Sequence, residues 1–146
     1  SHRHRAVPIQ GRPLISTRLL GVIGERIAVG WLRRRGWRIV DTNRFVGHDE
    51  IDIVAESPDG STISFVEVKS TRGRGGSIQN RVDVRKRDHL RRSAMKMASG
   101  YPEHSIRIDV ITVQLIGWWM PRVRHFANVV QTRDLHASGR SRGARS

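Results

Sequence analysis

The stretch that most constrains the fold is Phe-Val-Glu-Val-Lys at residues 65–69, an apolar run interrupted by one acid and one base. As a β-strand, its period of two places Phe65, Glu67 and Lys69 on one face of a sheet. Charges on a sheet otherwise suited to a core are costly unless they are paired or bind an ion. Two interpretations follow: an ion pair on a half-exposed strand, or part of a metal-dependent phosphodiesterase site in which Glu67 holds the cation and Lys69 positions water or phosphate.

The charge of the whole chain indicates the class of partner. Its 146 residues carry 27 basic and 13 acidic side chains, a net charge of +14. Such an excess attracts polyanions, so nucleic acid, above all DNA, is the expected partner. The absence of cysteine excludes disulfides and Cys-based zinc sites. No apolar run approaches the ~18 residues of a membrane span, so we expect no membrane association and a cytoplasmic location.

The chain length suits one domain. We expect a basic N-terminal arm over residues 1–16, an α/β domain over 17–131 and a disordered basic tail over 132–146. Hydrophobic periodicity and turn residues predict the elements of that domain. Helices are expected at 17–35 and 81–99, and strands at 37–43, 49–54, 62–69, 106–115 and 122–130.

The first predicted helix contains two glycines and one acid of interest. Gly21 and Gly24 each cost about 1 kcal/mol relative to Ala in a helix interior, so we expect the helix backbone to lie close to the sheet there. Ser16 or Thr17 is the expected N-cap, and Gly36 the stop. Glu25 falls at the margin of the apolar stripe, where an ordinary ion pair with a nearby Arg is the simpler interpretation.

A hairpin is expected to bring Asp52 close to Glu67. In the strand at 49–54, Glu50 and Asp52 should share one face, with Ile51 and Ile53 on the other. Symmetric closure about the turn at 57–60 sets Asp52 opposite Phe65, and Glu67 becomes its diagonal neighbour about 7–8 Å away. A bulge would instead bring Asp52 directly opposite Glu67.

Basic residues follow this strand in the sequence. Residues 70–80 form a Gly- and Arg-rich loop, which can wrap phosphates or serve as a flexible connection. A basic helix comes next. Together they supply the candidate nucleic-acid-binding residues, which are Arg72, Arg74, Arg85, Lys86 and Arg87.

Three motifs in this order resemble one known family. They are Gly-Val-Ile-Gly-Glu at 21–25, Asp-Glu-Ile-Asp-Ile-Val at 49–54 and Phe-Val-Glu-Val-Lys at 65–69. The chain resembles the YraN-type family of small bacterial proteins, UPF0102, over about residues 17–130. That family belongs to the PD-(D/E)XK nuclease-like superfamily and is similar to archaeal Holliday-junction resolvases. The resemblance implies an α/β, restriction-endonuclease-like core with a mixed central sheet flanked by helices.

The resemblance also implies roles for individual residues. Asp52 and Glu67 would bind Mg²⁺ or Mn²⁺, with the Val68 carbonyl as a further ligand. Lys69 would be the catalytic lysine and Glu25 a catalytic acid borne on the helix. Lys86 would line the site from the second helix.

One departure from the family pattern concerns the residues before the second motif. The family usually has Gly before Glu-Ile-Asp, whereas this chain has Asp49 preceded by His48. The added carboxylate is either a further ligand or a mark of lost cleavage. The sequence therefore predicts a Mg²⁺-dependent endonuclease that hydrolyses phosphodiester bonds of DNA, including branched or single-stranded structures, and it is compatible with a homodimer. The alternative is a non-catalytic nucleic-acid-binding module that retains the nuclease fold.

Overall fold

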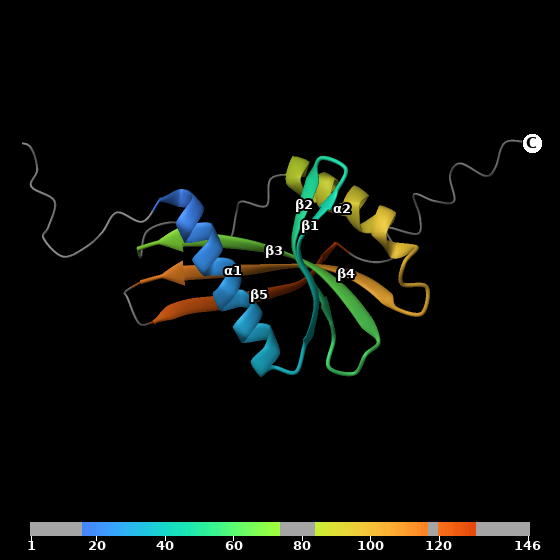
Figure 1. Ribbon diagram of the computed structural model, residues 1–146, viewed down its shortest axis with the longest axis horizontal. Helices are drawn as coiled ribbons and strands as arrows, with labels where there is room; N and C mark the ends of the chain where they lie inside the picture. Colours follow the sequence, from blue (N-terminus) through green and yellow to red (C-terminus); the bar gives the residue numbers. More distant parts are fainter. Residues whose placement is uncertain (1–15, 74–83, 117–119, 131–146) are drawn as a thin grey trace, which may run out of the picture.

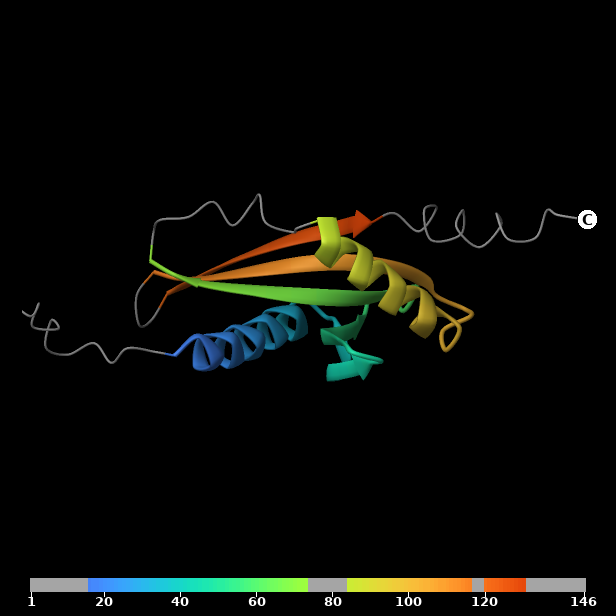
Figure 2. The same ribbon diagram turned by 90° about the horizontal axis from the view of Figure 1, so that it is seen from above.

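A five-stranded mixed sheet lies between two helices in the computed structural model, which describes residues 16–73, 84–116 and 120–130 (Figures 1 and 2). Strands β1 to β5 follow one another across the sheet, and only β3 and β4 are parallel. The elements are α1 Thr17–Arg34, β1 Arg38–Val46, β2 Asp49–Glu56, β3 Thr62–Arg72, α2 Val84–Ala98, β4 Ser105–Leu115 and β5 Pro121–Val130. The predicted α/β class, with a mixed central sheet flanked by helices, is confirmed.

Some expectations fall on parts of the chain that the structure does not describe. The N-terminal arm, apart from Ser16, and the C-terminal tail lie outside the described residues, as does most of the Gly- and Arg-rich loop. In the described part of the chain, neither helix is both long and apolar enough to cross a membrane.

Helix α1 begins and ends where the sequence predicts. The Ser16 hydroxyl accepts a hydrogen bond from the Leu19 backbone N–H at 3.1 Å, which caps the first turn. Gly36 follows the helix with a φ of +87°, a conformation that favours glycine. A side chain at Gly24 would collide with Ser70 of β3, so close approach to the sheet explains this glycine. The same explanation is wrong for Gly21, where an added Cβ would meet no atom within 4 Å among the described residues.

Two apolar clusters cover the two faces of the sheet, and each buried Ile, Leu or Phe side chain contributes about 1.5–3 kcal/mol. The cluster under α2 contains Ile51, Val54, Ile63, Phe65, Leu90, Ala94, Ile106 and Ile108. The cluster under α1 contains Ala28, Leu32, Ile53, Ala55, Val66, Ile111 and Val113. The prediction that Ile51 and Ile53 share a face is therefore wrong. The regular alternation of side chains between the two faces of β2 is interrupted at Asp52.

The turn between β2 and β3 contains more residues than the symmetric closure about residues 57–60 that the sequence predicted. Val54, and not Asp52, pairs with Phe65. The physical reason is the turn: the Gly60 N–H bonds to the Ser57 carbonyl, but the Ser57 N–H bonds to the Thr62 carbonyl, so the loop extends through residue 61. The last pair between the strands joins Ile53 to Val66, which leaves Asp52 next in register to Glu67.

Candidate metal centre

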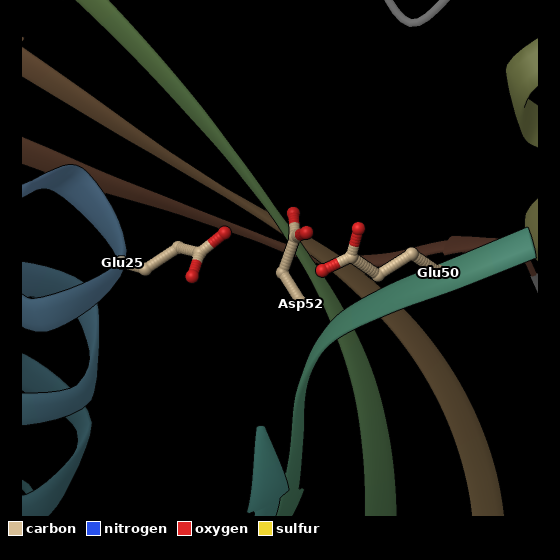
Figure 3. Close-up of side chains that lie close together, drawn as sticks. All are labelled: Glu25, Glu50 and Asp52. Carbon is tan, nitrogen blue, oxygen red and sulfur yellow. The ribbon is translucent and has the colours of Figure 1, made fainter. Parts of the chain in front are cut away.

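Three carboxylates converge where α1 meets β2. Glu25 extends from α1, and Glu50 and Asp52 extend from β2, with one oxygen of each lying within 4.8 Å of the others (Figure 3). Glu25 and Asp52 are half-buried, whereas Glu50 is exposed. Glu50 is thus a member of this group that the predicted ligand set omitted, although its shared face with Asp52 was the signal that could have identified it.

Asp52 is held in place by the backbone of β3. Pairing between β2 and β3 stops at Ile53, and beyond it the Val68 N–H donates to Asp52 Oδ2 at 2.8 Å. Burial raises the pKa of Asp52, and the Val68 hydrogen bond offsets only part of this desolvation. The negative charges of Glu25, Glu67 and Glu50 add to the rise, and together these causes bring the pKa to about 6. A cation at this position would relieve that repulsion.

Asn43 forms hydrogen bonds with two of the three carboxylates, and sequence analysis did not identify it as a site residue. Its amide, oriented with the nitrogen toward the acids, donates to Glu25 Oε2 at 3.1 Å and to Glu50 Oε1 at 2.7 Å. Asn43 lies in β1 between the residues paired with Ile53 and Ile51, and its φ is +51°. Burial raises the pKa of Glu25, the Asn43 hydrogen bond lowers it, and the charge of Glu50 raises it, with a net upward shift.

The Glu67 and Lys69 side chains form an ion pair beside this group. Lys69 Nζ lies 3.2 Å from Glu67 Oε1, and Glu67 is buried. The pair that the simpler interpretation predicted is therefore present. Glu67 also lines a cleft of about 480 Å³ together with Glu25, Glu50 and Asp52. The two interpretations are therefore not exclusive, because Glu67 belongs both to the ion pair and to the wall of the cleft.

Asp49 lines the same cleft as the three carboxylates and contacts α2. The Ser93 hydroxyl donates to Asp49 Oδ2 at 3.2 Å, and His89 Nδ1 lies 3.2 Å from Asp49 Oδ1. Asp49, His48, His89 and Ser93 all line the cleft. Their contacts connect the cleft wall to α2, and neither His89 nor Ser93 carried a sequence signal.

The predicted nucleic-acid-binding residues are placed only in part. Arg72 is exposed at the end of β3. Arg74 lies outside the described residues. Arg85, Lys86 and Arg87 belong to the first turns of α2, but the structure does not describe their side chains. Their contact with nucleic acid, and the position of Lys86 in the site, stay predictions.

The donor set of the acid group suits a hard divalent cation. Three carboxylate oxygens, with room in the cleft for water, match the ligands that Mg²⁺ and Mn²⁺ prefer. Ligand distances of 2.0–2.1 Å would require the three oxygens to move together slightly. Glu25, Glu50 and Asp52 could therefore hold a metal ion.

Comparison with known proteins gives weak structural likenesses and many relatives in sequence. One such solved structure is Pyrococcus furiosus SfsA in complex with Ca²⁺, 21% identical, with a TM-score of 0.38 over 78% of this chain and 64% of that one. At this score the likeness bears on neither fold nor function.

The sequence relatives are closer. A UPF0102 protein of Geobacter sulfurreducens is 35% identical over 78% of this chain and 90% of its own length. A UPF0102 protein of Corynebacterium efficiens is 39% identical over 64% of this chain and 76% of its own length. The model of the uncharacterised protein family UPF0102 matches residues 24–113, which include all three carboxylates, Glu67 and Lys69. The chain therefore belongs to family UPF0102.

Proposed function

We propose that this protein is a Mg²⁺-dependent endonuclease with a restriction-endonuclease-like core that hydrolyses phosphodiester bonds of DNA. The observation that carries the proposal is the convergence of Glu25, Glu50 and Asp52 beside the Glu67–Lys69 pair. A purely structural role leaves this convergence unexplained, because mutual repulsion and burial raise the pKa of both Glu25 and Asp52.

The side chains take distinct roles in this proposal. Asp52, fixed by the Val68 N–H, is the central ligand, and Glu50 and Glu25 approach the same point from either side. Glu67 and the Val68 carbonyl are the further ligands from β3. A bound Mg²⁺ or Mn²⁺ would supply the activation of water and would offset negative charge on the reacting phosphate. Lys69 donates to that water or to a phosphate oxygen.

The proposed partner is DNA, and the proposed location is the cytoplasm. The net charge of +14 supports a polyanionic partner with little dependence on base sequence. Arg72, Arg74, Arg85, Lys86 and Arg87 are proposed to contact phosphates, and a homodimer is compatible with this activity.

Substitution of the carboxylates tests the activity. In Mg²⁺, Asp52→Asn and Glu67→Gln should lower cleavage of labelled DNA more than about 100-fold, beyond the usual cost of losing an outer-shell partner. Metal-free DNA binding should stay equal or become stronger, because each change removes a negative charge that repels phosphate. Lys69→Ala should also stop cleavage while slightly weakening binding. Cleavage rate, metal-free affinity and melting temperature are measured for each variant.

Glu103→Gln is the matched control, since it removes an exposed carboxylate outside the cleft. It should cleave at the wild-type rate. Cleavage that persists in folded Asp52→Asn would refute the site. A wild-type protein that binds but cleaves no linear, single-stranded, flapped or four-way DNA would instead be the non-catalytic binding module.

A further inference from the structure

A second hollow runs along α1 on the other side of the acid group. It is a groove of about 910 Å³ between α1 and β1, lined on the helix side by Arg18, Arg26 and Arg33. Val22 and Val29 lie between these arginines in the lining, at steps of three and four residues that keep all five on one helical face. Glu25 and Glu50 line both this groove and the acid cleft. The two hollows therefore meet at the candidate metal centre.

The arginines form a row suited to a phosphate backbone. With a rise of 1.5 Å per residue, Arg18 and Arg26 are about 12 Å apart along the helix axis, and Arg26 and Arg33 about 10 Å. All three side chains are exposed. A guanidinium presents a planar fork of donors that matches phosphate oxygens. The groove volume is that of a site for a drug-sized ligand, which is enough for a short segment of one strand.

Gly21 supplies a separate argument that something approaches α1 here. A glycine within a helix costs about 1 kcal/mol relative to Ala, and Gly24 is explained by its contact with Ser70. Gly21 has no such explanation in the described protein, because an added Cβ would meet no atom within 4 Å. Gly21 lines both hollows, at the place where they join. The open space beside its backbone is available to a ligand.

We propose that the groove binds one unpaired strand of nucleic acid, whose backbone follows Arg33, Arg26 and Arg18 and passes Gly21 beside the acid group. This inference rests on the proposed nuclease function for the position of the scissile phosphate. It narrows the substrate to nucleic acids with a single-stranded segment. The strand-binding surface also extends to α1, beyond the loop and α2 where the sequence placed phosphate contacts.

The first experiment substitutes Gly21 with Ala. Because the change improves helix propensity and meets no protein atom, Gly21→Ala should raise the melting temperature by about 2–4 °C. Its affinity for a short fluorescent DNA single strand, measured by anisotropy in Ca²⁺ buffer with gels to verify that the strand stays intact, should fall about tenfold or more. A structural role for Gly21 would instead lower the melting temperature and the affinity together. Wild-type affinity in Gly21→Ala would overturn the proposal.

The second experiment removes the row of charges. The Arg18→Gln, Arg26→Gln, Arg33→Gln triple variant should reduce the slope of log affinity against log salt by about 2, since each phosphate contact on a single strand contributes about 0.7. A matched triple variant loses the exposed Arg34, Arg122 and Arg124, none of which lines the groove. Its slope should change by less than half as much. An equal loss in both variants would overturn the groove as the strand site.

These measurements separate the groove from the nuclease activity. Wild-type protein that binds single strands but cuts no DNA in Mg²⁺ would overturn the proposed nuclease function. The Gly21→Ala variant and the triple variant of Arg18, Arg26 and Arg33 would still test whether the groove binds the strand. If wild-type protein cuts DNA but both variants bind and cut as it does, the groove proposal fails alone. Wild-type protein that binds blunt duplex more tightly than single strands would overturn the inferred substrate class.

Discussion

At the scale of single residues, the half-buried Asp52 and the buried Asp109 differ in how they compensate for the loss of water around a carboxylate. Burial raises the pKa of both Asp52 and Asp109. For Asp109, hydrogen bonds from His125, Arg107 and the Asn128 N–H outweigh burial and lower the pKa to about 2. Arg107 donates to both of its oxygens at 2.8 Å. For Asp52, the Val68 hydrogen bond does not outweigh burial, and the nearby acids add to the rise in its pKa. This contrast distinguishes a structural acid from a candidate ligand.

Asp109 should therefore stabilise the fold in a pH-dependent way. Its pKa is lower in the folded state than in the unfolded chain, so the contribution is present above about pH 4 and is lost as the pH falls toward 2. A shift from 3.8 to about 2 corresponds to about 2 kcal/mol. Asp109→Asn should lower the free energy of unfolding by about 3 kcal/mol at pH 6, because Arg107 and His125 lose their partner.

Urea unfolding of both proteins between pH 2 and 6 measures this effect. The difference between wild type and Asp109→Asn should narrow as the pH falls through that range. A difference that stays constant would show that ionisation of Asp109 does not contribute.

At the scale of elements, the β1–β2 hairpin positions most of the acid group. Asn43 has a left-handed backbone in β1, opposite the point where the alternation of β2 changes at Asp52. This irregularity turns Glu50 and Asp52 toward Glu25, and the Asn43 amide then links Glu25 to Glu50. The hairpin, and not the central strand β3, thus supplies two of the three converging carboxylates.

Two substitutions at Asn43 separate its backbone from its amide. Asn43→Gly keeps the left-handed conformation accessible and should leave stability within about 0.5 kcal/mol, whereas Asn43→Ala should lose about 1 kcal/mol. Both remove the hydrogen bonds to Glu25 and Glu50 and should weaken Mn²⁺ binding about 10-fold or more. Calorimetric titration and thermal melts measure the two effects. Wild-type Mn²⁺ affinity in Asn43→Gly would exclude the amide from positioning the ligands.

The sequence predicted the elements better than the way they join. The ends of α1 follow from local signals at Ser16 and Gly36, and the charges at Glu67 and Lys69 indicated a site on the central strand. The pairing of β2 with β3 depends on how many residues the turn takes, and a turn motif at 57–60 does not specify that number. The role of Asn43 depends on a backbone irregularity in β1 and on contacts across three elements, which no local pattern reveals.

At the scale of the whole molecule, the excess of positive charge should govern encounter with nucleic acid. The net charge of +14 is spread over many arginines, whereas the acid cleft is a local region of negative charge. Long-range attraction brings a polyanion to the surface, and a cation in the cleft would remove the local repulsion. In the proposed nuclease, binding and cleavage would thus depend on different parts of the molecule.

Wild-type protein should bind DNA with a steep dependence on salt and little preference for base sequence. Affinity for two single strands of unrelated sequence should differ by less than about threefold, yet fall more than about tenfold between 50 and 200 mM salt. Anisotropy titrations over this range provide the measurement. A flat plot of log affinity against log salt concentration would remove charge as the basis of binding.

The pairing along the sheet is unequal, and the strand that carries Glu50 and Asp52 is joined to β3 by few residue pairs. β3 and β4 share eleven pairs, while β2 joins β3 through only four. Local unfolding could detach the end of the hairpin that carries Glu50 and Asp52 and leave the parallel core intact. A ligand that binds only the folded form of this hairpin end stabilises that form. A cation held between α1 and β2 would therefore keep the hairpin end folded against the rest of the protein. Part of the free energy of metal binding would then stabilise the folded hairpin end, and the measured metal affinity would be lower by that amount.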